Sequence, residues 1–146
     1  SREGPSYVEY VGLADELPKL AAEADIIVNA LPLTPSTRGL FDKALFDQVK
    51  PGAYFVNVGR GGTVVTADLV AALDSGQLAG AGLDVTDPEP LPADHPLWQM
   101  PNVIITPHVS WAGADRRLHD MLVRENIRRY LAGEALLNVV DPERGY

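Results

Sequence analysis

Four ionisable side chains, Arg60, Asp84, Glu89 and His108, each lie at the end of a short apolar segment or in the loop that follows one. The guanidinium of Arg60 is a planar fork suited to a carboxylate or a phosphate. The imidazole of His108 can exchange a proton near neutral pH, and a carboxylate bonded to its other ring nitrogen would set its tautomer and favour its charged form. These side chains therefore favour acid–base chemistry on a small anion.

A 2-oxo acid is the kind of substrate that suits these groups. Arg60 would bind the carboxylate of the substrate and contact its carbonyl oxygen. His108 would donate a proton to that oxygen while the carbonyl carbon accepts a hydride. Glu89 would hold the imidazole, and Asp84 would accept a hydrogen bond from a ligand amide. The sequence has no cysteine, and one histidine with two carboxylates on separate elements is a poor zinc site, so we expect no metal.

Each of these residues also has an ordinary structural interpretation. Arg60 could be a surface residue that caps a strand turn, Asp84 a loop cap, Glu89 a solvent-exposed carboxylate and His108 a structural histidine. Their expected placement along one edge of a sheet favours the chemical interpretation. The two other histidines lack such neighbours, and we interpret both as structural.

The chain alternates apolar, β-branched segments with segments of helical periodicity. Strands are predicted at 7–11, 25–31, 54–58, 79–85 and 103–109. The strands at 25–31 and 54–58 are predicted to be buried, the first of them on both faces of the sheet. Amphipathic helices are predicted at 13–24, 42–49, 66–75 and 113–131. Asp15 and Thr66 are expected to cap two of these helices. This order predicts an α/β fold with a mostly parallel sheet and right-handed crossovers.

Parallel strands end at the same edge of a sheet, where open α/β sheets bind their ligands. Arg60, Asp84 and His108 would therefore lie along one edge. Glycines on both sides of Arg60 would let the backbone turn sharply and come close to a ligand. Glu89 lies in the segment 87–92, where alternating prolines prevent regular structure and predict a stiff loop.

The composition argues against several classes of protein. The 146 residues include 20 acidic and 12 basic side chains, and the net charge of -8 argues against a nucleic-acid-binding surface. Hydrophobic residues make up 46%, which is enough for the core of one domain. No apolar run reaches membrane-spanning length, so we expect no membrane partner, and the absence of cysteine is compatible with the cytoplasmic location that we expect.

Four segments resemble successive signatures of the D-isomer-specific 2-hydroxyacid dehydrogenases, especially the glyoxylate/hydroxypyruvate reductases and the phosphoglycerate dehydrogenases. They are LPLTPSTRGL at 31–40, NVGRGG at 57–62, GLDVTDPEPLP at 82–92 and ITPHV at 105–109. The resemblance extends from about residue 7 to the end of the chain. It implies a Rossmann-type domain that binds NAD or NADP, a small 2-oxo acid or 2-hydroxy acid as substrate, and a homodimer.

The resemblance also assigns roles to individual residues. Arg60 is similar to the family's substrate-binding arginine, His108 to its acid/base and Glu89 to the carboxylate partner of that histidine. Asp84 is similar to the residue that holds the nicotinamide carboxamide. Glu89 also argues against the formate dehydrogenase branch, which has a glutamine in that role. The remaining positions that would line the cofactor are Leu31, Pro32, Thr37, Val58, Gly59, Ser110 and Gly113.

The sequence departs from the family's pattern because it contains no G-x-G-x-x-G motif, the loop that binds the dinucleotide. We therefore expect an incomplete, doubly wound Rossmann-type sheet at 1–112 that lacks its first two strands, and a helix and tail at 113–146 that would pack on a substrate domain. The strand at 25–31 would have a bare apolar edge. The chain by itself would be an inactive fragment of an enzyme. Arg2 could belong to a 2'-phosphate site, which would favour NADP.

Two other functions are compatible with the same residues. The fold also serves as a nucleotide-sensing interaction module in transcriptional corepressors, which can retain the catalytic trio. An unrelated α/β binding domain could carry Arg60, Glu89 and His108 by coincidence. A substrate-dependent rate separates the dehydrogenase from the first alternative, and loss of activity in Arg60→Ala and His108→Ala variants separates it from the second.

Overall fold

The computed structural model describes residues 4–112, 116–141 and 143. They belong to two compact units, Ser1–His108 and Val109–Tyr146.

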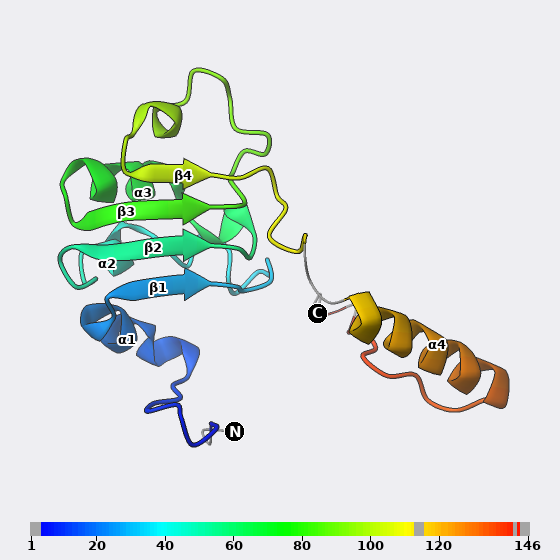
Figure 1. The fold of residues 1–146 in the computed structure, drawn as a ribbon. Helices are drawn as coiled ribbons and strands as arrows, with labels where there is room; N and C mark the ends of the chain where they lie inside the picture. The colour runs from blue at the N-terminus through cyan, green and yellow to red at the C-terminus, as the bar shows by residue number, and fades with distance from the viewer. Residues whose placement is uncertain (1–3, 113–115, 142, 144–146) are drawn as a thin grey trace. The chain divides into compact units, whose positions relative to one another are not determined.

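The first unit is built on a four-stranded parallel sheet in the order β1-β2-β3-β4 (Figure 1). Because every crossover leads to the neighbouring strand, the order in space is the order in sequence. The alternation of strands and helices confirms the predicted α/β fold. The strands are Ile26–Asn29, Ala53–Asn57, Leu78–Leu83 and Val103–Ile105.

Two helices, α2 and α3, lie behind the sheet in Figure 1 and cover one of its faces. The core lies between them and the strands, and the ring of Phe55 lies 5.1 Å from that of Phe41 and 5.6 Å from that of Phe46. A short α1, preceded by the 3₁₀ turn η1, leads into β1. The bounds are Ala14–Glu16 for η1, Leu17–Glu23 for α1, Lys43–Phe46 for α2 and Thr66–Asp74 for α3.

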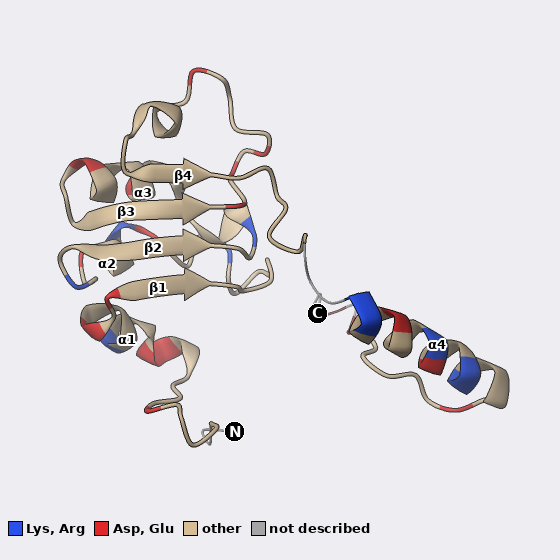
Figure 2. Cartoon of the chain, viewed as in Figure 1, with Lys and Arg blue, Asp and Glu red and all other residues tan. Residues whose placement is uncertain are grey.

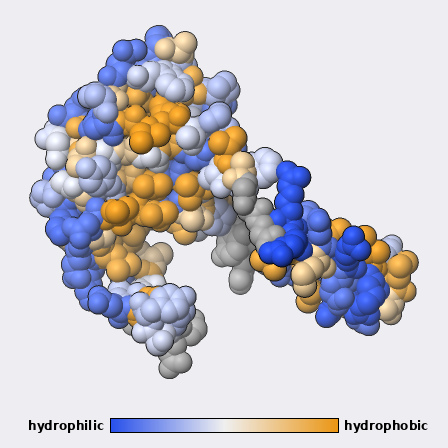
Figure 3. Space-filling model, viewed as in Figure 1, coloured by the Kyte–Doolittle hydropathy of each residue, from blue (hydrophilic) through white to orange (hydrophobic). Residues whose placement is uncertain are grey.

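The opposite face of the sheet is apolar and uncovered. Ile26 and Val28 are each 60% exposed, Tyr54 is 53% exposed and Ile104 is 71% exposed. Figure 3 shows these apolar side chains gathered over the strands. Within the first unit, the prediction that the strand at 25–31 is buried on both faces is therefore wrong, because no described element of this unit packs on this side. Among the described residues β1 pairs with β2 alone, so its outer edge is bare, as predicted.

The strand predicted at 7–11 does not form. These residues make turns and bends, and Tyr7 is 85% exposed. A strand requires a neighbour to accept and donate its backbone hydrogen bonds, and the described part of the chain provides none here.

Both predicted helix caps are also wrong. Asp15 lies inside η1, and the acceptor at its start is Glu16, whose carboxylate accepts from the backbone N–H of Leu13 at 2.9 Å. Thr66 is the first residue of α3 rather than its cap. Its hydroxyl donates instead to the carbonyl of Asp87, 21 residues further along the chain.

The second unit contains one long helix, α4, Arg116–Ala132, on which acidic and basic side chains are interspersed (Figure 2). Arg128 pairs with Glu125 at 2.9 Å and with Glu134 at 2.7 Å. Asn126 exchanges two hydrogen bonds with the backbone of Leu137, so the tail runs back along the helix. Hydrogen bonding to Arg128 lowers the pKa of Glu125 to about 2. No helix in the described ranges has the length and apolar character needed to cross a bilayer.

Candidate active site

The Arg60 turn follows directly from the end of β2. The chain leaves the strand after Asn57 and enters the 3₁₀ turn η2, Gly61–Thr63, with Arg60 in extended conformation just before it. Arg60 is exposed, and its Nη1 donates to the carbonyl of Gly59 at 2.8 Å. The guanidinium therefore lies at the carboxyl end of β2, as predicted.

A buried polar network fixes this turn. Asn29 at the end of β1 donates to Asn57 Oδ1 at 3.0 Å and to Thr63 Oγ1 at 2.7 Å. Thr63 in turn donates to the carbonyl of Arg60 at 2.7 Å, and Asn57 accepts from the backbone N–H of Gly59 at 3.1 Å. All three polar side chains are at most 1% exposed, so bonds within the network must satisfy them. The network holds the backbone that presents the guanidinium.

The glycines beside Arg60 are required for space. A Cβ on Gly59 would lie 2.6 Å from the carbonyl oxygen of Leu31, and one on Gly61 would lie 1.9 Å from that of Thr86. Neither glycine has a positive φ. We expected these residues to let the backbone approach a ligand, whereas here they let the loops after β1, β2 and β3 touch one another through their main chains. The loop after β2 therefore packs directly against the loops after β1 and β3.

Glu89 and His108 form a hydrogen-bonded pair, as predicted. Glu89 Oε1 lies 2.7 Å from His108 Nδ1, and both side chains are about two-fifths exposed. An ionised carboxylate only accepts, so Nδ1 donates and Nε2 is the ring nitrogen that can exchange a proton with a ligand. His108 has a φ of +54°, a conformation that non-glycine residues rarely adopt. Its backbone N–H donates to the carbonyls of Asp84 and Thr106, both at 3.0 Å, which holds this conformation.

Asp84 lies next to this pair in a cavity of about 380 Å³. It is only 5% exposed, and its Oδ1 accepts from the hydroxyl of Thr106 at 2.6 Å. We expected a carboxylate free for a ligand amide, but one oxygen already has a partner. A carboxylate has several acceptor positions, so a second donor remains compatible. Arg60 is at the end of the neighbouring strand and does not line this cavity. Its lining residues include Asp84, Glu89, Leu91, Trp98, Ile105 and His108.

The positions predicted to line the cofactor lie after β1 and β2. Gly59 packs against the backbone of Leu31, which brings the two loops together. Leu31 and Val58 are apolar yet each 36% exposed. Thr37 uses its hydroxyl within its own loop, where it donates to the carbonyl of Pro32 at 2.6 Å. Exposed apolar side chains at the ends of β1 and β2, and a buried carboxylate, Asp84, at the end of β3, suit the flat ring and the carboxamide of a nicotinamide.

The three other predicted cofactor positions are Arg2, Ser110 and Gly113. Ser110 is exposed and belongs to the second unit. Arg2 and Gly113 fall outside the described residues.

The other two histidines have ordinary structural surroundings. His95 Nδ1 accepts from a backbone N–H at the start of the 3₁₀ turn η3, Pro96–Gln99. The side chain of His119 is 77% exposed on α4 and lies 3.7 Å from Asp120. In the ranges that the structure describes, no group of three or more His, Cys, Asp or Glu side chains could hold a metal ion.

The chain is similar to proteins of known family. The model of the D-isomer specific 2-hydroxyacid dehydrogenase, NAD binding domain, matches residues 2–110. A glyoxylate/hydroxypyruvate reductase A of Photorhabdus laumondii is 42% identical over 132 residues, which are 90% of this chain and 42% of that protein.

Two solved structures share the fold. A D-isomer specific 2-hydroxyacid dehydrogenase from Xanthobacter autotrophicus Py2, in complex with NADPH and MES, is 49% identical with a TM-score of 0.83, over 90% of this chain and 42% of that one. An NADPH-dependent glyoxylate/hydroxypyruvate reductase from Sinorhizobium meliloti, in complex with NADP and sulfate, is 41% identical with a TM-score of 0.86, over 100% of this chain and 48% of that one. The chain thus spans less than half the length of these relatives, and its sheet matches part of a Rossmann-type domain, as predicted.

Proposed function

Because the chain belongs to the D-isomer-specific 2-hydroxyacid dehydrogenase family, we propose that it supplies the acid–base and substrate-binding residues of a reductase that acts on a small 2-oxo acid. The type favoured is a glyoxylate/hydroxypyruvate reductase, which is the name of the relatives from Photorhabdus and Sinorhizobium. The observation that carries the proposal is the 2.7 Å bond between Glu89 and His108, beside the buried carboxylate of Asp84.

The residues would divide the reaction among them. Arg60 binds the substrate carboxylate in a forked ion pair and orients the carbonyl. His108 Nε2 donates its proton to the carbonyl oxygen, and the carboxylate of Glu89 stabilises the imidazolium before transfer and holds the ring afterwards. A nicotinamide cofactor, when bound, supplies the hydride to the carbonyl carbon. The C=O double bond becomes a C–O single bond as new C–H and O–H bonds form, so the product is a 2-hydroxy acid.

The cofactor would be held by residues of three loops. Asp84 accepts from the carboxamide, while Leu31 and Val58 offer apolar contact at the ends of β1 and β2. NADP is favoured over NAD because the relatives from Xanthobacter and Sinorhizobium were solved with NADPH and NADP.

We also propose a homodimer, in line with the uncovered apolar surface of the sheet. We propose a cytoplasmic location, in line with the absence of cysteine.

The corepressor-type alternative is not favoured by any of these observations. The relatives reported above are named as reductases or dehydrogenases.

A chimera tests the function directly. The matching segment of the Sinorhizobium reductase is replaced by this chain, and oxidation of NADPH and NADH is followed with glyoxylate, hydroxypyruvate and pyruvate. The 146-residue chain is assayed beside it. We expect turnover by the chimera with preference for NADPH, and none by the chain alone, because the chain lacks the Gly-rich dinucleotide loop.

Variants of the chimera test the individual roles. His108→Gln should lower kcat by about 10²–10⁴-fold, the usual contribution of general acid catalysis, and Arg60→Ala should chiefly raise KM. His119→Gln is the matched histidine control and should leave both constants unchanged. A folded chimera that binds NADPH but reduces none of the acids, or a His108→Gln variant with full activity, would contradict the proposal.

A further inference from the structure

The loop that carries Glu89 has few backbone donors of its own. Between residues 87 and 92 every second residue is proline, and Pro88, Pro90 and Pro92 have no backbone N–H. Such a segment presents mainly carbonyl oxygens, which can accept hydrogen bonds from donors in other parts of the chain. The hydrogen-bond donors that bind these carbonyls therefore influence the position of Glu89.

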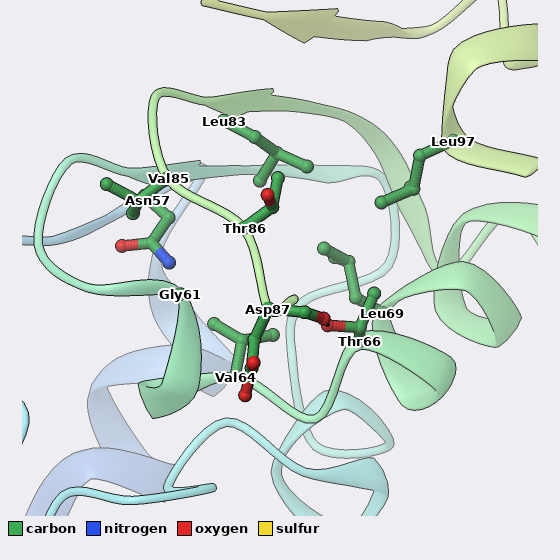
Figure 4. A pocket seen from close by; sticks show the side chains of 10 residues that line it. All are labelled: Asn57, Gly61, Val64, Thr66, Leu69, Leu83, Val85, Thr86, Asp87 and Leu97. Carbon is green, nitrogen blue, oxygen red and sulfur yellow. Dashed lines mark hydrogen bonds between the residues drawn. The ribbon is translucent and has the colours of Figure 1, made fainter. Parts of the chain in front are cut away.

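Side chains on two other elements provide donors at the two ends of the loop. Thr66, at the start of α3, donates from its hydroxyl to the carbonyl of Asp87 at 2.6 Å. Figure 4 shows Thr66 and Asp87 beside each other on the wall of a small cavity that does not include Glu89. Trp98 in η3 donates from its indole Nε1 to the carbonyl of Pro92 at 2.9 Å. Between these two points the side chain of Leu91 is buried in the core.

The carboxylate of Glu89 has little packing of its own to hold it. Its side chain is 42% exposed. The distance to His108 Nδ1 is 2.7 Å, and a displacement of about 1 Å would take the pair beyond hydrogen-bonding range. The position of the loop backbone is therefore one determinant of whether the bond forms.

We propose that Thr66 and Trp98 are positioning residues that fix the loop at both ends and thereby set the Glu89 carboxylate against Nδ1 of His108. The importance of this pair for catalysis rests on the function proposed above. Thr66 acts from the far side of the loop, and its hydroxyl touches neither member of the pair. Thr86, which donates to the carbonyl of Pro88 at 2.9 Å, belongs to the same segment and cannot tie it to another element.

The test is the tautomer of His108, measured by long-range ¹H–¹⁵N NMR of the histidine rings in the 146-residue chain at alkaline pH. Thr66→Val removes the hydroxyl donor while keeping the shape of the side chain, and Trp98→Phe removes the indole donor while keeping an aromatic ring. Each should lower the ratio of Nδ1–H to Nε2–H tautomer at His108 by about threefold or more, the effect of weakening one charge-assisted bond. Thr66→Ser restores the hydroxyl and should restore the ratio.

Ser75→Ala is the matched control. It removes a hydroxyl that donates to the carbonyl of Ala72 at the other end of α3, and it should leave the ratio at His108 unchanged. Unchanged ratios in both Thr66→Val and Trp98→Phe, with native spectra elsewhere, would overturn the proposal. A changed ratio together with a chimera that shows no turnover would retain the positioning role and refute only the proposed function, whereas turnover by the chimera with unchanged ratios would do the reverse.

Discussion

Replacing Gly61 by alanine would separate two loops that touch through their main chains. The added Cβ would lie 1.9 Å from the carbonyl oxygen of Thr86 and 2.8 Å from the backbone nitrogen of Asp87, whereas Cβ contacts under 3.0 Å essentially do not occur. The Arg60 turn and the loop before Glu89 must therefore move apart by about 1 Å or more. No side-chain rotation can relieve this clash, because the atoms on the other side belong to the backbone.

The expected cost follows from this geometry. Overpacking a well-packed interior costs about 1–3 kcal/mol, and occasionally more. Gly61 is buried, and both loops continue from strand ends that the sheet holds in place. We therefore expect Gly61→Ala to lower the free energy of unfolding by about 3 kcal/mol or more. For a unit of about 100 residues this corresponds to a fall in Tm on the order of 10 °C.

Gly62→Ala is the matched control for this measurement. A Cβ on Gly62 would meet the flexible ends of the Leu33 and Arg38 side chains at 3.1 Å and 3.4 Å. Both substitutions reduce the freedom of the unfolded chain equally, so that effect cancels in the comparison. Urea unfolding of the two variants, followed by circular dichroism, should show Gly62→Ala within about 1 kcal/mol of the parent chain. Equal losses in the two variants would refute the packing of Gly61 against the next loop.

Other perturbations test the remaining parts of the structure. Asn57→Leu should lower the free energy of unfolding by about 1–3 kcal/mol, because it leaves the buried amide of Asn29 with one acceptor fewer, and urea unfolding measures this. Val28→Thr, on the uncovered face, should change the same quantity by less than about 0.5 kcal/mol, and a larger loss would mean that the face is covered in solution. The pKa of Glu125 is lowered to about 2 by its hydrogen bond to Arg128, so its contribution to helix α4 is complete above about pH 4.5 and is lost as the pH falls through about 2. Circular dichroism should show helicity falling in that range, and Glu125→Gln should remove that part of the pH dependence.

The sequence was sufficient to predict the pair at the centre of the site. Glu89 and His108 are 19 residues apart, yet one lies in a loop stiffened by prolines and the other follows a strand of the same sheet. Parallel strands end at a common edge, so knowing the strands is enough to bring the two loops together. The same reasoning correctly placed Arg60 at the end of β2.

The packing of the loops after β1, β2 and β3 could not be predicted from the sequence. It depends on contacts between segments that share no local sequence pattern. Asn29 and Asn57 look like ordinary strand ends, and only the pairing of β1 with β2 makes them neighbours. The sequence around Gly61 does not show whether the backbone at this glycine packs against Thr86 or against a ligand. The predicted strand at 7–11 failed for a related reason, since its apolar residues indicate a strand only if a neighbouring strand is present.

The uncovered face of the sheet also affects the thermodynamics of the first unit. Ile26, Val28, Tyr54 and Ile104 are more than half exposed in the native state, so unfolding brings little further apolar surface from these side chains into water. The heat capacity change of unfolding reflects newly exposed apolar area and is ordinarily about 12–15 cal/mol/K per residue. For this unit it should be smaller, and the curve of stability against temperature should be correspondingly flat. The first unit would then lose little stability on cooling.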